Sequence, residues 1–262
     1  MSGPDTIDLK GITWNHTRGL VPMVAAAQRF EELNPGVRIS WKKRSLQEFA
    51  DQPLAELGAR YDLLVIDHPW AGFAATSGVL TPMEELVSAE FLADQAANSV
   101  GPSHESYRYG DRQWALAIDA ATPVAAWRRD LLEARGVAPP ETWEDLLALA
   151  REGLVIMPGI PQDTIMNFYM LCARPESDLF ASEEIVVSDE LGVIALEQLR
   201  ELASLQPREI FEMNPIAVYE TMTRGDDYAY CPFAYGYSNY ARAGYARRVL
   251  HFGDVVSLDG VP

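Results

Sequence analysis

The first part of the chain alternates between short apolar runs and stretches with helical spacing. The apolar runs lie at residues 7–13, 37–41 and 61–66, and each has the length of a strand. After the second run, Ser45 and Glu48 have the spacing of a capping box, which begins a helix. Between the first two runs, apolar side chains recur every three or four residues, at Leu20, Met23, Val24, Ala27 and Phe30. This strand–helix–strand–helix–strand order predicts a parallel sheet with helices on its faces.

The same kind of pattern restarts after residue 122. Strands are predicted at 123–127, 154–157 and 228–233, and helices at 130–135, after Thr142, at 163–173, after Ser188 and after Asn214. A two-residue turn at Gly110-Asp111 predicts a hairpin before the restart. The restart favours two α/β lobes, at residues 1–118 and 124–262, joined by a hinge crossover at 119–123.

Composition and charge exclude several classes of protein. The chain has 262 residues, of which 48% are hydrophobic, and this suits a folded globular protein. No stretch approaches the roughly 20 consecutive apolar residues that span a bilayer. The net charge of −17 repels phosphate backbones, so we do not expect nucleic acid as a partner. Residues 1–6 have neither the basic nor the apolar region of a signal peptide.

The chain lacks the short motifs that mark common enzymes and metal sites. It has no glycine-rich phosphate-binding motif, no zinc-protease motif and no nucleophile elbow, and no two of its four histidines have metal-ligand spacing. We therefore expect neither a cofactor nor a resident metal. Cys172 and Cys231 lie far apart in apolar surroundings, which favours two buried free thiols, with one disulfide as the alternative.

Polar and aromatic side chains follow each of the first three predicted strands. Ligands of open α/β sheets bind at the carboxyl ends of the strands, so these three loops are predicted to meet at a binding edge. The alternative is that Trp14 and Trp70 belong to the core and that residues 42–44 form a solvated turn. The loop residues are Trp14, Asn15, His16, Thr17 and Arg18, then Lys42, Lys43 and Arg44, and then Asp67, His68, Pro69 and Trp70.

A tyrosine-rich segment stands out in the second lobe. Seven of the eleven tyrosines fall between Tyr219 and Tyr245. Tyrosine offers a flat apolar face and a hydroxyl at its edge, which suits a sugar. The segment is therefore predicted to form part of a sugar-binding wall, and a packing segment or a partner interface is the alternative.

Several of these segments together resemble one known family. In residues 61–82 an apolar strand ends at Asp67, and a loop, a helix closed by Gly78 and a turn at Pro82 follow. Residues 28–39, 127–132, 140–147 and 230–233 add further similar motifs in a similar order. On these motifs the chain resembles the family-1 extracellular solute-binding proteins, the maltose-binding-like receptors of ABC importers.

The resemblance implies a fold and a function. The fold is the type II periplasmic-binding-protein fold, with two α/β lobes and a ligand cleft between them. The function is that of the substrate-binding component of an ABC importer, which is not an enzyme and closes by hinge motion on a small polar solute. A carbohydrate is the expected solute class, neutral or anionic, and ABC permease subunits are the expected partners. The implied location is periplasmic or extracellular, while the missing signal peptide leaves a cytoplasmic one open.

The resemblance also implies a set of ligand-binding residues, carried over position by position. They are Trp14, Asn15, His16, Arg18, Lys43, Arg44, Asp67, His68, Asp119, Thr122, Asp163, Asn167, Phe233, Tyr235 and Tyr237.

The resemblance also predicts that part of the family's chain is missing here. In the family the chain returns to the first lobe after the point where this sequence ends, so the resemblance implies that the chain is truncated and that both lobes are incomplete.

Two alternative functions remain open from the sequence. One is an enzyme with Asp67 and His68 as an acid–base pair, although adjacent strand residues point to opposite faces. The other is a metal or iron carrier that uses His16, His68 and tyrosines.

Overall fold

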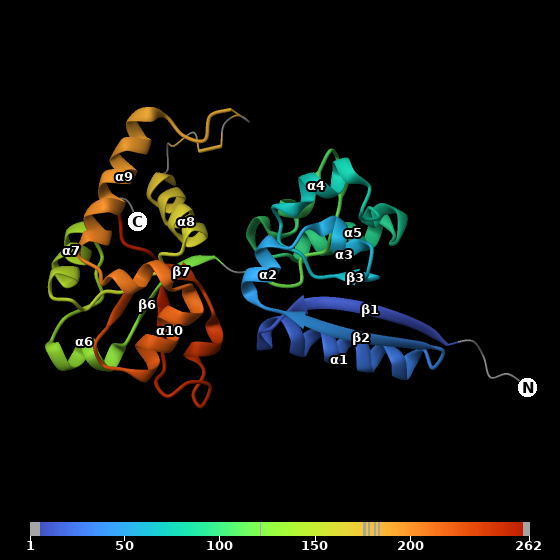
Figure 1. Cartoon of the computed structure of the whole chain (residues 1–262), viewed down its shortest axis with the longest axis horizontal. Coiled ribbons are helices and arrows are strands. Elements are labelled where there is room, and N and C mark those ends of the chain that lie inside the picture. Colours follow the sequence, from blue (N-terminus) through green and yellow to red (C-terminus); the bar gives the residue numbers. More distant parts are fainter. Residues whose placement is uncertain are drawn as a thin grey trace, which may run out of the picture. The chain divides into compact units, whose positions relative to one another are not determined.

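The structure is a computed structural model with two compact units, unit 1 (Met1–Ala120) and unit 2 (Ala121–Pro262) (Figure 1). It describes residues 6–120, 122–174, 177, 179–180, 182 and 184–258. The division between the units falls within residues 119–123, the stretch predicted as a crossover. None of the helices in the described residues is long and apolar enough to cross a membrane.

Unit 1 contains the predicted parallel sheet. Its strands are β1 (Ile7–Trp14), β2 (Val37–Arg44) and β3 (Leu63–Leu64), in the order β2-β1-β3. Strand β3 is shorter than predicted, but the Asp62 and Val65 amides still donate to β1 carbonyls, over 2.8 and 3.0 Å. Strand β2 continues to Arg44, so the interpretation of residues 42–44 as a solvated turn is wrong. The reason is the ladder with β1, whose register pairs Lys42, Lys43 and Arg44 with residues 12–14.

The described residues of unit 1 also form α-helices, whose ends follow local sequence signals. They are α1 (Thr17–Leu33), α2 (Leu46–Asp51), α3 (Leu54–Gly58), α4 (Trp70–Ser77) and α5 (Ala89–Asn98). Ser45 and Glu48 form the predicted capping box of α2, and Gly78 ends α4 in the left-handed conformation that glycine favours. The predicted hairpin is confirmed as β4 (Arg108–Tyr109) and β5 (Arg112–Gln113).

Unit 2 is built on an antiparallel sheet. Strand β6 (Pro123–Trp127) lies between β7 (Tyr230–Tyr235) and β8 (His251–Gly253). The predicted strand at 154–157 is a buried segment with a single parallel bridge, from Val155 to Tyr230. The helices are α6 (Arg129–Arg135), α7 (Trp143–Arg151), α8 (Pro161–Cys172), α9 (Asp189–Ser204) and α10 (Pro215–Arg224).

The core of unit 2 contains a fully buried arginine. The Arg128 guanidinium donates to both carboxylate oxygens of Asp130, to Asp226, and to the carbonyls of Met222 and Gly225, over 2.7–2.8 Å. A buried cation is tolerated when charged and polar partners replace its water. Arg128 therefore joins the end of β6 to the end of α10.

Both cysteines are free and buried, as the favoured interpretation of the sequence had it. Cys172 ends α8 and Cys231 lies in β7, and neither side chain is exposed. Burial raises the pKa of both thiols.

Candidate functional site

The three loops of unit 1 meet at the carboxyl edge of its sheet, as the topology requires. The Cα atoms of Trp14 and Arg44 pair across the ends of β1 and β2, and the Asn15 amide donates to the Arg44 carbonyl over 2.7 Å. Asp67 and His68 follow β3 on the other side of β1. Asn15 and His68 are exposed and Asp67 is half-buried. Unit 1 thus presents the predicted hydrogen-bonding groups along one edge.

An ion pair joins this edge to the end of unit 1. The Arg18 Nε and Nη2 atoms donate to Asp119 Oδ2 over 2.9 and 2.6 Å. His16 caps the N-terminus of α1, and its Nδ1 accepts the Arg18 amide proton over 3.2 Å. Burial and the Arg18 charge lower the pKa of His16 against the opposing effect of Asp119, which favours the neutral imidazole. The fold therefore brings together three predicted site residues, two of which are 101 positions apart.

Tyr107 belongs to the same neighbourhood, and sequence reasoning did not identify it. Its hydroxyl donates to the Ile66 carbonyl over 3.1 Å, and the His68 ring meets the Tyr107 ring edge-on at 6.5 Å. Burial and the charges of Asp67 and Asp119 raise the pKa of Tyr107 to about 12. In the sequence Tyr107 only preceded a hairpin turn, and no motif marked it as a site residue.

The two predicted cations at the end of β2 have different surroundings. Lys43 is exposed, whereas Arg44 is only 6% exposed and donates to the Val65 carbonyl over 3.0 Å. Trp14 is also buried, because its ring packs on Phe49 at 5.2 Å and closely against Gly19. This packing fits the alternative in which Trp14 is a core residue. Solute contacts for these residues remain predictions.

In unit 2, Asp163 and Asn167 lie one turn apart on α8, and both are buried. Asn167 Nδ2 donates to the Pro158 carbonyl over 2.9 Å. Asp163 Oδ2 has no hydrogen-bond partner among the described residues, and burial raises the pKa of this carboxyl to about 7. Near neutral pH both the protonated and the ionised form of Asp163 are therefore populated, so its carboxyl group can donate or accept a hydrogen bond.

The raised pKa of Asp163 predicts how stability depends on pH. The Asp163 carboxyl loses its proton near pH 4 in the unfolded chain and near pH 7 in the folded protein. The free energy of unfolding therefore falls as the pH rises between these two values, and Asp163 changes it no further at higher pH. Asp163→Asn removes this dependence. We expect the variant to be more stable than the wild type by about 1–2 kcal/mol at pH 8, less than the pKa shift implies because a buried amide also needs partners.

Thermal melts of both proteins from pH 4 to pH 8 test this expectation. The control is Asp189→Asn, which changes an exposed carboxylate at the start of α9. If the melting temperature of the wild type changes across this pH range no more than that of Asp163→Asn, the pKa of Asp163 is not raised in the folded protein.

The other predicted residues of unit 2 lie near the end of β7. Thr122 is exposed, and its carbonyl accepts the Gly236 amide proton over 2.9 Å. Tyr235 is half-buried, whereas Phe233 and Tyr237 are only 2% and 7% exposed and belong to the core. A wall that includes Phe233 and Tyr237 is thus not open in this structure, because both rings pack inward.

Most of the tyrosine-rich segment is core, so the packing alternative describes it better. Tyr219 is fully buried, and its ring lies within 6.4 Å of the rings of Tyr237, Tyr240 and Phe252. The Tyr219 hydroxyl donates to the Tyr235 carbonyl over 3.1 Å, and the Tyr240 hydroxyl donates to Glu220 over 2.8 Å. Both of these buried hydroxyls have a partner, which makes this part of a polar-looking segment suitable for a core.

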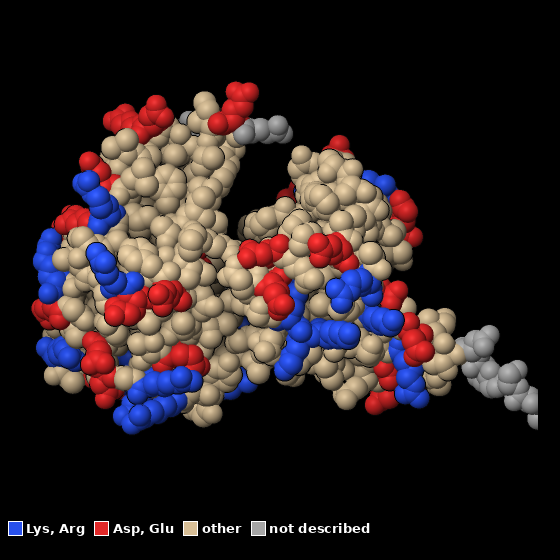
Figure 2. All heavy atoms as spheres, viewed as in Figure 1, with Lys and Arg blue, Asp and Glu red and all other residues tan. Residues whose placement is uncertain are grey.

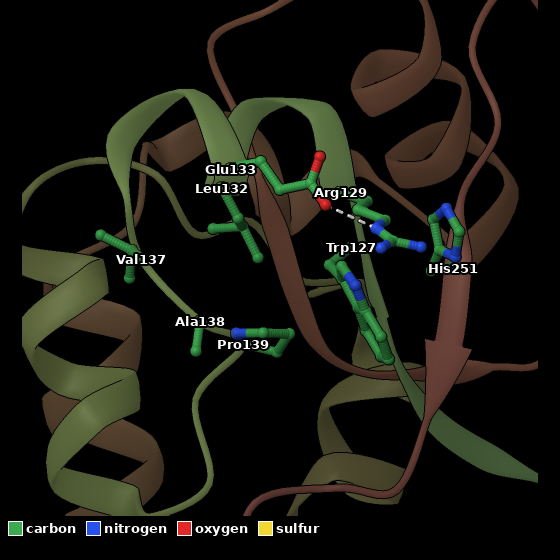
Figure 3. A pocket seen from close by; sticks show the side chains of 8 residues that line it. All are labelled: Trp127, Arg129, Leu132, Glu133, Val137, Ala138, Pro139 and His251. Carbon is green, nitrogen blue, oxygen red and sulfur yellow. Dashed lines mark hydrogen bonds and ion pairs between the residues drawn. The ribbon is translucent and has the colours of Figure 1, made fainter.

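Unit 2 also has a hollow of ≈ 350 Å³ that contains none of the predicted site residues (Figure 3). Its walls are Trp127, Arg129, Leu132, Glu133, Val137, Ala138, Pro139 and His251. The Trp127 ring stacks on His251 at 6.2 Å, and Arg129 pairs with Glu133 over 2.7 Å. Strand β6 begins beside the crossover and ends at Trp127, so the hollow and Thr122 lie at opposite ends of this strand.

Charged side chains are unevenly distributed (Figure 2). Lys, Arg, Asp and Glu are interspersed over much of the visible face of each unit, whereas the surface over α4 is largely uncharged. Helix α4 has no charged residue, and the only Lys, Arg, Asp or Glu of α8 is the buried Asp163. Among the described residues, no three His, Cys, Asp or Glu side chains gather as a metal site would require.

Solved structures of solute-binding proteins match this fold. An ABC transporter solute-binding protein from Agrobacterium radiobacter K84 in complex with ribitol is 19% identical, with a TM-score of 0.76 over 100% of this chain and 69% of that one. One from Agrobacterium vitis S4 with bound D-mannitol is 16% identical, with a TM-score of 0.74 over 97% and 65%. The maltotriose-binding protein of Thermus thermophilus is 18% identical, with a TM-score of 0.70 over 97% and 68%. The chain thus spans about two thirds of the length of these structures.

These matches confirm the expected fold class, a mixed α/β fold of the type II periplasmic-binding-protein kind. A family model described as bacterial extracellular solute-binding protein matches residues 13–154, more than half of the chain. The protein therefore belongs to the family of bacterial extracellular solute-binding proteins, which are not enzymes.

Proposed function

We propose that this chain binds a neutral polyhydroxy solute, a sugar or a polyol, as the binding component of an ABC importer. The observation that carries the proposal is the pairing of Arg18 with Asp119 at the edge of the unit 1 sheet. An arginine that is already neutralised by a carboxylate offers little attraction to an anionic solute. Exposed Asn15 and half-buried Asp67 at the same edge suit the hydroxyl groups of a sugar.

The remaining charges agree with a neutral solute. The buried guanidinium of Arg44 is turned to backbone carbonyls, and Asp67 and Asp119 place negative charge beside Tyr107. Because Asp119 is paired with Arg18, the Asp67 charge is the one that repels an anion, and the Asp67 oxygens accept hydrogen bonds from hydroxyl groups. Lys43 is the exposed cation among the predicted residues of unit 1, and its charge does no more than balance that of Asp67.

The structural matches support a sugar or a polyol as the class of solute. Proteins of the same fold hold ribitol, D-mannitol and maltotriose. Because the identities are below 20%, these solutes are starting probes for this chain. We propose in addition that Asp163, Asn167 and Tyr235 of unit 2 contact the solute, that a hinge at residues 119–123 closes on it, and that ABC permease subunits receive it.

The other functions considered from the sequence have less support. The family is not enzymatic, so the interpretation of Asp67 and His68 as a catalytic acid–base pair is wrong. His68, which the metal or iron carrier alternative also uses, packs its ring against Tyr107.

Calorimetric titration with matched pairs of solutes tests the proposal. Ribitol, D-mannitol, maltose and maltotriose form the neutral set, and glucuronate and glucose 6-phosphate form the anionic set. We expect at least one neutral solute to bind and both anions to bind more weakly. Tighter binding of an anion, or no binding by any member of the panel, would show that the proposal is wrong.

Substitution at Asp67 tests the site itself. Asp67→Asn keeps the size of the side chain and removes its charge, so we expect a loss of affinity of about 10- to 100-fold for the neutral solute that binds. The matched control is Asp94→Asn on α5, which makes the same change at an exposed position outside the candidate site. Equal affinities for Asp67→Asn and the wild type would remove Asp67 from the site.

A further inference from the structure

Arg44 has an unusual environment for an arginine at a ligand-binding edge. It ends β2, and its side chain is 6% exposed. Within the described residues it forms no ion pair with a carboxylate, and its Nε has no hydrogen-bond partner. The Glu48 carboxylate attracts Arg44 through space, but the hydrogen-bond acceptors of the guanidinium are backbone carbonyls. A buried guanidinium of this kind costs free energy that an apolar side chain of similar length avoids, so burial alone does not explain the residue.

The hydrogen bonds of Arg44 reach both neighbouring loops. Its carbonyl accepts the amide proton of Asn15, the first residue after β1, over 2.7 Å. Its Nη2 donates to the carbonyl of Val65 over 3.0 Å, two residues before Asp67. Its Nη1 lies 3.4 Å from the carbonyl of Glu48 in α2.

A ring contact adds a further connection. The guanidinium lies over the Phe49 ring at 5.0 Å, and the Phe49 ring lies 5.2 Å from that of Trp14. One side chain thus contacts the end of β3, helix α2 and, through Phe49, the end of β1.

We propose that Arg44 is a positioning residue that holds the loops after β1 and β3 at the spacing the solute requires, without contacting the solute. The inference rests on the proposed binding at this edge and deepens it. The resemblance had placed Arg44 among the ligand contacts, whereas its donors point to backbone carbonyls. The solute is then bound by Asn15 and Asp67, whose separation Arg44 sets.

The test compares Arg44→Met with Arg38→Met. Both remove one arginine from β2, but Arg38 is exposed, pairs in register with Asp8 near the start of the strand and lies outside the site. In Arg44→Met we expect affinity for the neutral solute that the wild type binds to fall about tenfold or more. We also expect faster hydrogen–deuterium exchange at the amides of residues 15–19 and 65–71, with unchanged exchange in unit 2. Arg38→Met should match the wild type in both measurements.

The outcomes separate this inference from the proposed function. If Arg44→Met keeps wild-type affinity and wild-type exchange in these loops, the inference is wrong while solute binding stands. If only the affinity for glucuronate or glucose 6-phosphate falls, Arg44 is a solute contact and the inference is also wrong. If the wild type binds none of the panel, the proposed function fails, and loop exchange alone decides the role of Arg44. If Arg44→Met does not fold, Arg44→Lys replaces it, since lysine keeps the charge but cannot reach two carbonyls with a planar fork.

Discussion

Replacement of Arg128 by methionine is expected to destabilise unit 2 by about 3 kcal/mol. Methionine fills most of the space of the arginine stem but donates no hydrogen bonds. The carbonyls of Met222 and Gly225 then lose a buried donor. The carboxylates of Asp130 and Asp226 are more than half exposed and regain water, so the loss is smaller than for a fully buried ion pair.

Urea denaturation followed by circular dichroism measures this change. The matched control is Arg129→Met at the next position, where the side chain is 64% exposed and pairs with an equally exposed Glu133. An exposed pair of this kind contributes roughly 0–1 kcal/mol. If the two variants unfold at the same urea concentration, the Arg128 network does not stabilise unit 2 as described.

Tyr219→Ala is expected to destabilise unit 2 by about 4 kcal/mol, because it leaves a cavity at the centre of an aromatic cluster. Tyr219→Phe keeps the ring and loses the hydrogen bond to the Tyr235 carbonyl, so we expect a loss of about 1 kcal/mol. The difference between the two variants separates packing from hydrogen bonding.

The same experiment decides between the two interpretations of the tyrosine-rich segment. Tyr109→Ala, at a position that is 49% exposed, serves as the control for loss of a tyrosine. If Tyr219→Ala weakened solute affinity and left the unfolding transition unchanged, the segment would be a binding wall after all.

Local signals in the sequence predicted much of the fold. Ser45, Thr142, Ser188 and Asn214 each begin a helix as predicted, because a capping side chain bonds to an amide within its own turn. The extension of β2 through Lys42 and Lys43 was missed. Charged residues are uncommon in strands, and here the long ladder with β1 outweighs that preference.

The candidate site was predictable only where topology alone determines it. Parallel strands carry their following loops to one edge, so Asn15 and Asp67 could be placed there from the sequence. The pairing of Arg18 with Asp119 and the approach of Tyr107 to His68 depend on packing between distant segments, and no local pattern encodes them. The tyrosine-rich segment is a different case, since composition does not show which hydroxyls find partners inside the core.

Because Cys172 and Cys231 are buried, fluorescent labels can be attached selectively to cysteines introduced at the surface. Thiol-reactive dyes attack exposed thiolates, so buried thiols with raised pKa values should stay unmodified in the folded protein. A double variant with cysteines at the exposed positions Glu56 on α3 and Glu197 on α9 could therefore carry a donor and an acceptor dye in an otherwise native chain. Energy transfer between the two dyes, measured on single protein molecules, would then report changes in the distance between the units as solute is added.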